Sequence, residues 1–181
     1  MDFVFVTSNH NKLREAEQIL ERKVAHSDID VPEIQSINGA DIVRDKAERA
    51  YKILKKPVVV EDTGLYIESL NGFPGALVKL VLVNCGTDGI ARLVKRGQSR
   101  AAHAEVYIGF YDGKKMRIFS GRTDGRIALR PRGKSGFGWD VLFVPKGYTK
   151  TYSQMSSELK NKISHRGKAF RKLKRYLSRP S

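Results

Sequence analysis

Two adjacent carboxylates, Glu61 and Asp62, are the residues with the clearest capacity for chemistry. They follow residues 58–60, three valines that predict a short strand buried on both faces. Carboxylates at the end of a buried strand repel each other and lose hydration, and a bound divalent cation is the usual partner that offsets this. A strand end with two solvated acids is the alternative. The glycine-rich segment that follows favours a site.

That segment holds two expected bends. We expect Thr63-Gly64 to turn the chain directly after the carboxylates, and residues 71–75, with their two glycines, to form a second bend.

A second polar segment, residues 7–12, follows the apolar run 3–6, which predicts another buried strand. Ser8 and Asn9 are N-cap candidates for a helix with apolar residues at helical spacing. Free N–H groups at the helix start, with Lys12 one turn in, suit a phosphate. An ordinary cap with a solvated lysine is the alternative.

A basic, glycine-rich loop spans residues 130–138 and places Phe137 between two glycines. The ring is either a stacking surface for a planar base or a loop aromatic that folds back onto the core. A strand is expected at 141–144.

Near the C-terminus, Ser164 can cap a last helix, so that His165 and Arg166 open it. We expect their donors to point outward and read an acceptor. Beyond them, Arg171, Lys172, Lys174 and Arg175 indicate a basic, solvated helix face.

Four segments match motifs of one family in the right order. They are Thr7, Asn9, Lys12 and Glu15; EDTGL at 61–65 with GFPG at 72–75; GFGWD at 136–140; and Lys160-Asn161 with Ser164-His165-Arg166. The chain resembles the inosine triphosphate pyrophosphatase family, of the archaeal type, which hydrolyses non-standard purine nucleoside triphosphates. Val141 stands where the family has a proline, which removes no side chain with an expected role.

The resemblance implies hydrolysis to the monophosphate and pyrophosphate, by water attack on the α-phosphorus with Mg²⁺. Asp62 is the expected catalytic residue, with Glu61 in reserve, and Glu33 and Asp62 are the expected metal ligands. The resemblance and the residue types together indicate these substrate contacts: Thr7, Asn9, Lys12 and Lys46 for the phosphates; Phe137 and Trp139 for stacking; Asp140, Lys160, His165 and Arg166 for the base edge. Ser8, Thr63 and Gly138 are expected as further substrate-binding residues.

The resemblance also implies an α/β fold with a long, mixed, twisted central sheet flanked by helices, two lobes and an active-site cleft between them. We expect one domain over residues 1–181, a homodimer and a cytoplasmic location. The single cysteine, Cys85, excludes an internal disulfide and fits a reducing compartment; it lies in an apolar run and is expected to be buried.

Periodicity predicts the remaining elements. An edge strand is expected within 23–31, and a helix capped by Asp41 with Val43, Ala47, Ala50 and Leu54 on its apolar face. Helices are expected at 76–84 and 90–95, a strand at 102–110, a hairpin turn at Asp112-Gly113, strands at 116–119 and 126–129, and a short helix from residue 156.

The net charge of +15 over 181 residues indicates a polyanionic partner, either nucleoside triphosphates or nucleic acid. A non-catalytic nucleic-acid-binding protein would explain the basic C-terminal helix but not Glu33, Glu61 and Asp62. A pyrophosphatase for another nucleotide, such as a pyrimidine triphosphate, is a further alternative. We expect no membrane partner and no specific nucleic acid partner.

Overall fold

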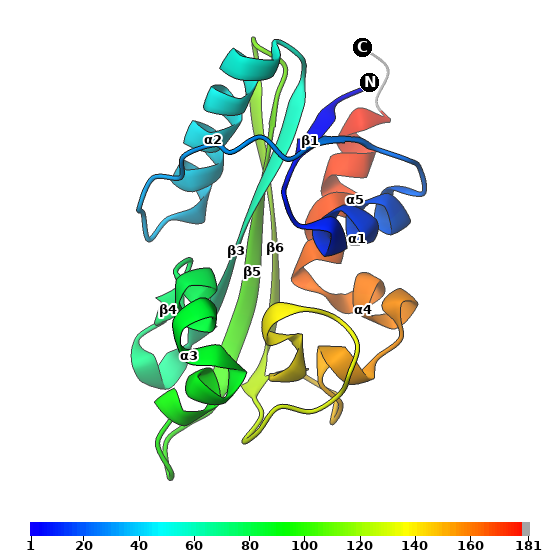
Figure 1. Ribbon diagram of the computed structural model, residues 1–181. Coiled ribbons are helices and arrows are strands. Elements are labelled where there is room, and N and C mark those ends of the chain that lie inside the picture. Colours follow the sequence, from blue (N-terminus) through cyan, green and yellow to red (C-terminus); the bar gives the residue numbers. More distant parts are fainter. Residues whose placement is uncertain (179–181) are drawn as a thin grey trace.

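The protein is built around one mixed, twisted sheet of seven strands, described here by a computed structural model of residues 1–178 (Figure 1). The strand order is β2-β1-β3-β5-β6-β7. The short strand β4 lies off this order and pairs with Leu65 and Tyr66 of β3. β1 is parallel to β2 and β3, whereas the other pairs are antiparallel. The strands are β1 Val4–Val6, β2 Ala25–Ser27, β3 Val58–Ile67, β4 Pro74–Gly75, β5 Ala101–Tyr111, β6 Met116–Ile127 and β7 Phe143–Pro145.

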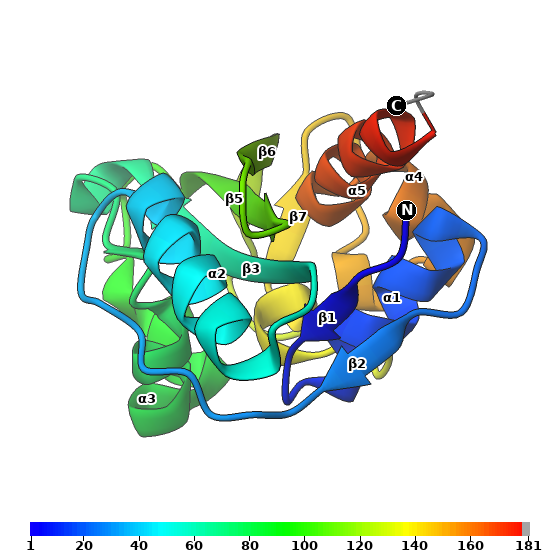
Figure 2. The ribbon, with the colours of Figure 1, turned by 90° about the horizontal axis from the view of Figure 1, so that it is seen from above.

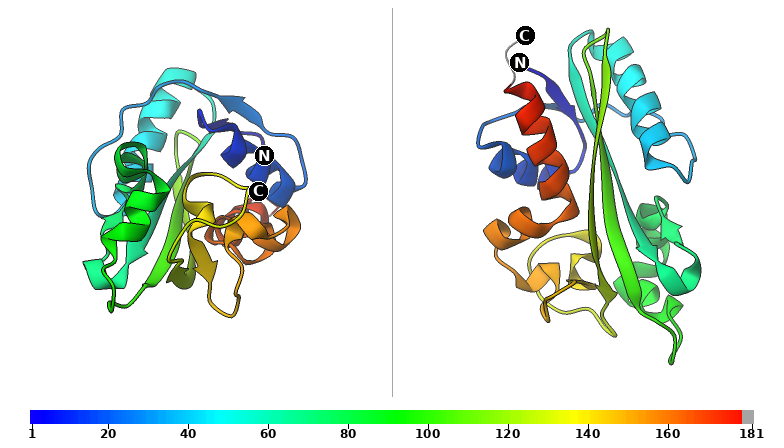
Figure 3. Two further views of the ribbon diagram at one scale, coloured as in Figure 1. Left: turned by 60° about the horizontal axis from the view of Figure 1, so that its bottom comes forward. Right: turned by 180° about the vertical axis from the view of Figure 1, so that it is seen from behind.

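Helices cover both faces of the sheet. α2 and α3 lie on one side, and α1, α4 and α5 lie on the other, as the views from above and from behind make clear (Figures 2 and 3). The helices are α1 His10–Leu20, α2 Gly39–Leu54, α3 Val78–Leu93, α4 Ser157–Ile163 and α5 His165–Leu177, and the 3₁₀ helices are η1 Glu68–Leu70, η2 Gly138–Val141 and η3 Tyr152–Gln154. The α/β class and the long central sheet are therefore as predicted.

The apolar core is divided, and the division falls in the middle of β3. Its first residues, Val58, Val59 and Val60, pack into clusters with α1, α2 and α5, whereas Leu65 and Ile67 pack with α3 and η2. β5 is divided in the same way. Ala102 and Ala104 pack in the cluster with α3 and η2, and later residues of β5 pack in the cluster with α1 and α5. The stretch between the two halves of the core is Glu61–Gly64, which therefore lies at the boundary of two lobes.

The expected turn at Thr63-Gly64 is wrong, because β3 continues through both residues and pairs with β5 as far as Ile67. Gly64 is needed for space rather than for a bend: a Cβ there would lie 2.5 Å from the ring of Tyr66. The second bend is confirmed, with positive φ angles at Asn71, Gly72 and Gly75.

Three other boundaries differ from expectation. β6 is one strand over Met116–Ile127, not two, because the polar stretch between its apolar ends still pairs residue by residue with β5. Asn38, not Asp41, caps α2, since its side chain accepts from the Ala40 N–H, and Asp41 lies in the first turn. The short strand near the C-terminal third starts at Phe143, after η2, rather than at residue 141.

Cys85 is exposed, which corrects the expected buried thiol. It lies on α3 just before Gly86, where non-helical angles break the helix. Two apolar residues of α3, Leu80 and Val83, are exposed with it, so the apolar run does not mark a fully buried helix.

No helix within residues 1–178 is both long and apolar enough to cross a membrane. The last three residues of the expected domain, 179–181, lie outside the described part of the chain.

Candidate active site

A cleft of about 640 Å³ opens at the boundary between the two lobes. Its walls come from the end of β1, the start of α1, the middle of α2, the middle of β3, the start of α3, η2 and the start of α5. The cleft brings together every predicted site residue except Lys160: Thr7, Ser8, Asn9, Lys12, Glu33, Lys46, Glu61, Asp62, Thr63, Phe137, Gly138, Trp139, Asp140, His165 and Arg166. Thr7 and Arg166, 159 positions apart in the sequence, thus share one cavity.

Asn9 is the N-cap of α1, and its side chain accepts from the N–H groups of Asn11 and Lys12 at 3.0 and 3.3 Å. Those two N–H groups are therefore already satisfied, which corrects the expectation of a helix start with free donors. Phosphate binding at this end of the cleft would depend mainly on the Lys12 side chain and on the positive end of the α1 helix dipole.

Glu61 is the centre of a buried ion network. It is 3% exposed, and it pairs with Lys12 at 3.1 Å and with Arg166 at 2.8 Å. Arg166 reaches Glu61 through Nε and Nη2, and Glu15 through Nη1 at 2.8 Å. Arg166 is 2% exposed, so its guanidinium does not point outward as expected. Most of its donors hold the floor of the cleft together.

This network fixes the charge of Glu61. Burial alone would raise its pKa, but Arg166 and Lys12 outweigh that effect and hold the pKa far below its ordinary value. The same carboxylate raises the pKa of Arg166 despite burial. Glu61 is thus an ionised structural anchor, and it is not suited to take up a proton near neutral pH.

The pKa of the neighbouring Asp62 is shifted in the opposite direction. Burial, together with the charges of Glu33 and Glu61, raises the pKa of Asp62 to about 6, although Lys12 and Lys46 act to lower it. Because β3 is a strand, side chains 61 and 62 point to opposite faces, which separates their partners. A carboxylate with this pKa, lining a cleft, is suited to proton transfer near neutral pH.

Glu33 and Lys46 form an ion pair at the edge of the same cleft. Lys46 holds the pKa of Glu33 below its ordinary value against the opposing effect of burial. Four carboxylates, Glu33, Glu61, Asp62 and Asp140, therefore line one cavity, and only Asp62 forms no salt bridge within residues 1–178.

The oxygen donors of Glu33 and Asp62 fit a hard divalent cation, because mutual repulsion between carboxylates is relieved when such an ion binds between them. Within residues 1–178, no group of three or more His, Cys, Asp or Glu side chains is arranged as a metal cluster. A cation bound through two carboxylates, with its other positions left to water and phosphate oxygens, is the arrangement that suits Mg²⁺.

Aromatic residues form another part of the wall. Trp139 is 8% exposed and stacks against His165, with ring centroids 5.4 Å apart, so it belongs to the core as well as to the cleft. Phe137 is half-buried, and its ring lies 4.8 Å from the Lys160 ammonium and 5.4 Å from the Arg166 guanidinium. Phe137 is thus the partly exposed aromatic surface of the cleft, whereas Trp139 is almost fully buried.

His165 is the polar group in this wall that lacks a partner. It is 1% exposed, lines the cleft, and neither ring nitrogen forms a hydrogen bond within residues 1–178. Burial and the cations Arg166 and Lys160 hold its pKa well below the ordinary value, so the ring is neutral. A neutral imidazole offers one donor and one acceptor.

Asp140 and Lys160 form a buried ion pair beneath this wall. Asp140 accepts from the Phe137 N–H at 2.9 Å, and Lys160 also reaches Glu15 at 2.7 Å. Lys160 does not line the cleft. The pair fixes the loop that carries Phe137.

Two residues were not assigned roles from the sequence. Glu15 bridges Arg166 and Lys160, and its position three residues after Lys12, on the same helix face, was the available signal. Lys79, at the start of α3, lines the cleft, and its positive charge helps to lower the pKa of Glu33. The only sequence signal for Lys79 was its place in the pair Val78-Lys79, shortly after the second bend.

The sequence profile of the Ham1 family matches residues 3–176. A dITP/XTP pyrophosphatase of Thermococcus kodakarensis is 40% identical to this chain, over 98% of the chain and 97% of that protein. An inosine triphosphate pyrophosphatase of Schizosaccharomyces pombe is 39% identical, over 96% and 94%. The solved structure of a HAM1 protein from Coxiella burnetii superposes with a TM-score of 0.83 at 27% identity, covering 98% of this chain and 99% of that one. The chain belongs to the Ham1 family.

Proposed function

We propose that this protein hydrolyses non-standard purine nucleoside triphosphates, namely inosine, deoxyinosine and xanthosine triphosphates, to the monophosphate and pyrophosphate. The observation that carries the proposal is that one cleft combines an acidic and lysine-rich part with an aromatic part that holds an imidazole without a hydrogen-bond partner among residues 1–178. The first part suits a triphosphate and its cation, and the second suits a base. The names of the T. kodakarensis and S. pombe relatives support this substrate class.

In the proposed reaction, a water oxygen attacks the α-phosphorus and the bond to the bridging oxygen of the β-phosphate breaks. Asp62 orients the water and accepts its proton, because it lines the cleft and forms no salt bridge within residues 1–178. Lys12 and Lys46 stabilise negative charge on the phosphate oxygens. Glu61 and Arg166 hold Lys12 and the floor of the cleft in place.

We propose Mg²⁺ as the cofactor, held by Glu33 and Asp62. When bound, it would neutralise charge on the phosphate oxygens and lower the pKa of coordinated water.

The products test the proposed reaction directly. A screen of the common and deaminated nucleoside triphosphates with Mg²⁺ should release pyrophosphate and the nucleoside monophosphate in equal amounts. Chromatography separates these products from a diphosphate and orthophosphate. Release of orthophosphate without added pyrophosphatase would refute attack at the α-phosphorus, and a preference for pyrimidine triphosphates would refute the substrate class.

Lys12→Ala is expected to raise KM by about tenfold or more with a smaller change in kcat, because Lys12 faces the cleft before the reaction begins and should stabilise bound substrate and transition state alike. Steady-state kinetics on inosine triphosphate measure both constants. Lys52→Ala, at an exposed position at the end of α2, is the control. An unchanged KM would place the phosphate site elsewhere.

We further propose that residues 1–181 act as a single domain, that the protein is a homodimer, and that it works in the cytoplasm, where nucleoside triphosphates are present. The dimer contact we propose is the exposed apolar face of α3 and the residue before it. Leu77, Leu80 and Val83 are spaced three residues apart, on one side of the helix, and are 39, 60 and 77% exposed. A second copy of the chain would cover this face.

Leu80→Asp combined with Val83→Asp is expected to convert the dimer to a monomer, because two charges would be desolvated in the contact. Light scattering after size-exclusion chromatography gives the mass. Ile53→Asp, which changes a 56% exposed residue on α2, is the control and should leave the mass unchanged. A dimeric double variant would locate the contact on another face.

A further inference from the structure

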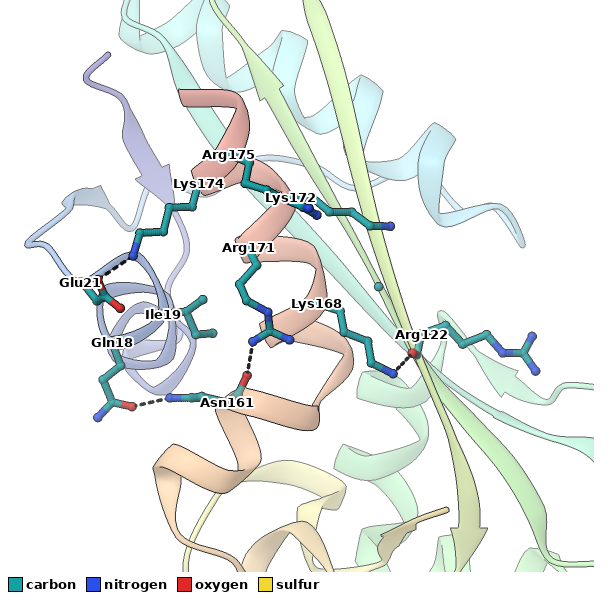
Figure 4. A pocket seen from close by; sticks show the side chains of 11 residues that line it. Gln18, Ile19, Glu21, Arg122, Asn161, Lys168, Arg171, Lys172, Lys174 and Arg175 are labelled. Atoms are coloured by element: carbon teal, nitrogen blue, oxygen red, sulfur yellow. Dashed lines mark hydrogen bonds and ion pairs between the residues drawn. The ribbon is translucent and has the colours of Figure 1, made fainter. Parts of the chain in front are cut away.

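A second cavity, a groove of about 790 Å³, lies between α5, the ends of α1 and α4, and β6, and shares no lining residue with the active-site cleft (Figure 4). Among its eleven lining residues there are six cations and one carboxylate, Glu21. The cations are Arg122, Lys168, Arg171, Lys172, Lys174 and Arg175. This basic groove concentrates positive charge in a way that the proposed hydrolysis does not require.

Only two of the six cations have carboxylate partners within residues 1–178. Lys174 pairs with Glu21 at 2.7 Å, and Arg122 pairs with Asp124 at 2.8 Å. The other four, on α5, form no salt bridge in this part of the chain: Lys168, Arg171, Lys172 and Arg175. Their charge is therefore free to attract an anion.

Neutral backbone carbonyls orient three of these side chains. Lys168 donates to the Arg122 carbonyl at 2.7 Å and Lys172 to the Ser120 carbonyl at 2.6 Å. Arg171 donates to the carbonyl of Asn161 at 2.9 Å, an interaction visible in the close-up (Figure 4). Carbonyls fix the positions of the side chains but leave their charge uncompensated, and each ammonium keeps donors for a further acceptor.

The four cations are arranged along a line. Lys168, Arg171, Lys172 and Arg175 occupy positions i, i+3, i+4 and i+7 of α5, so they share one face and span about 10 Å of its axis at about 1.5 Å per residue. A compact anion such as free phosphate would meet only one or two of them. A stacked nucleic acid strand carries one phosphate for about every 3.4 Å of its axis, so it presents several charges over the same length.

The lining also argues for contacts to phosphates rather than to bases. Ile19 is the apolar side chain among the eleven residues, and no aromatic ring is among them. Base stacking, on which most single-strand binding sites depend, has no surface here.

We propose that the basic groove binds the sugar–phosphate backbone of nucleic acid, without selecting its sequence. The contacts are charge-assisted hydrogen bonds from the four α5 cations to phosphate oxygens. This binding is separate from the proposed hydrolysis, because the two sites share no residue.

Fluorescence anisotropy with labelled single-stranded oligonucleotides of 20 nucleotides tests the proposal, using two unrelated sequences over a range of salt concentrations. We expect equal affinity for both sequences and a log-linear loss of affinity with salt. The triple variant Lys168→Gln, Lys172→Gln and Arg175→Gln removes three contacts. Because each contact to a single strand contributes about 0.7 to the salt slope, the slope should fall by about 2. Arg171 is left intact because it also holds α4.

The matched control is Lys52→Gln, Lys56→Gln and Lys114→Gln, which removes the same charge from exposed positions outside α5 and β6. It should keep the slope within about 1 of the original protein, because these lysines lie outside the groove. Equal losses in the two triple variants would overturn the proposal, since binding would then follow overall charge alone. Binding to vesicles of anionic lipid but not to oligonucleotides would overturn it as well. The groove variant should hydrolyse inosine triphosphate at the original rate.

Discussion

Asp62→Asn is expected to lower turnover of inosine triphosphate by about 10²–10⁴, the range for loss of a positioned general base. The amide keeps the shape of the side chain but accepts no proton at neutral pH. Asp62 is also a proposed cation ligand, so the rate must be measured at saturating Mg²⁺, which separates weak metal binding from lost proton transfer. Turnover near that of the original protein under this condition would remove Asp62 from the mechanism.

The same substitution is expected to stabilise the metal-free protein above pH 6. The folded-state pKa of Asp62, about 6, lies above its ordinary value of 3.8, so the folded state holds the extra proton between these values. Stability from this group is complete below pH 4 and is lost as the pH rises through 6. Removing the charge should recover at most about 3 kcal/mol at pH 7–8 and nothing at pH 4, as measured by denaturant unfolding.

Glu61→Gln is the matched comparison, since the neighbouring carboxylate has a pKa shifted in the opposite direction. Its ionised form stabilises the fold above the ordinary pKa, and that contribution is lost on acidification. Glu61→Gln should therefore destabilise the protein at pH 7–8, where Asp62→Asn stabilises it. Effects of the same sign would contradict the assignment of opposite states to the two carboxylates.

Inosine triphosphate is expected to be preferred over adenosine triphosphate by about 10⁴ in kcat/KM, the discrimination available to a site built to pair a polar group. The 6-keto group of hypoxanthine or xanthine accepts a hydrogen bond, whereas the 6-amino group of adenine donates one. The cleft wall near the base holds His165 and the remaining donor of Arg166. Adenine would leave this Arg166 donor without a partner. Comparable kcat/KM values for the two substrates would show that this wall does not select the base.

His165→Phe tests which group selects the base. The ring stacked on Trp139 is kept, but both nitrogens are removed. We expect kcat/KM for inosine triphosphate to fall by about 10–10², with little change for adenosine triphosphate. Phe137→Ala is the control. It removes a stacking surface that is nearly indifferent to the base, so kcat/KM should fall by the same factor for both substrates. Equal losses in His165→Phe would move base selection to another residue.

Arg166→Ala is a less direct test than its position in the motif implies. It would leave Glu15 and Glu61 buried without their shared cation, which costs about 3–5 kcal/mol for a buried pair. Loss of activity would then report on unfolding as much as on base recognition. Unfolding measurements must accompany any assay of this variant.

The composition of the cleft could be predicted because each of its walls carries a local signal. The carboxylates follow a valine strand, Lys12 follows a capping residue, and Phe137 lies between glycines. Short polar segments after apolar runs are where chains leave the core, so these residues collect at strand and helix ends. Their grouping in one cleft followed from the family resemblance, not from periodicity.

The charge partners could not be predicted. Which carboxylate pairs with Arg166 depends on the packing of α5 against β3 and α1, more than 100 residues away in sequence. Adjacent residues Glu61 and Asp62 look alike in the sequence, yet the strand directs them to opposite faces and opposite pKa shifts. The continuation of β3 through Gly64 was missed for a similar reason, because a glycine that makes room for Tyr66 looks the same as one that permits a turn.

The long strands β3 and β5, which pass from one half of the core to the other, have a mechanical consequence. The two sides of the cleft are joined by continuous hydrogen-bonded ladders, so the width of the cleft follows the twist of the sheet. Widening or narrowing it distributes a small torsion over ten or more residues of each strand. Substitutions near the strand ends that alter this torsion can therefore change the spacing of the catalytic groups elastically, without contacting any of them.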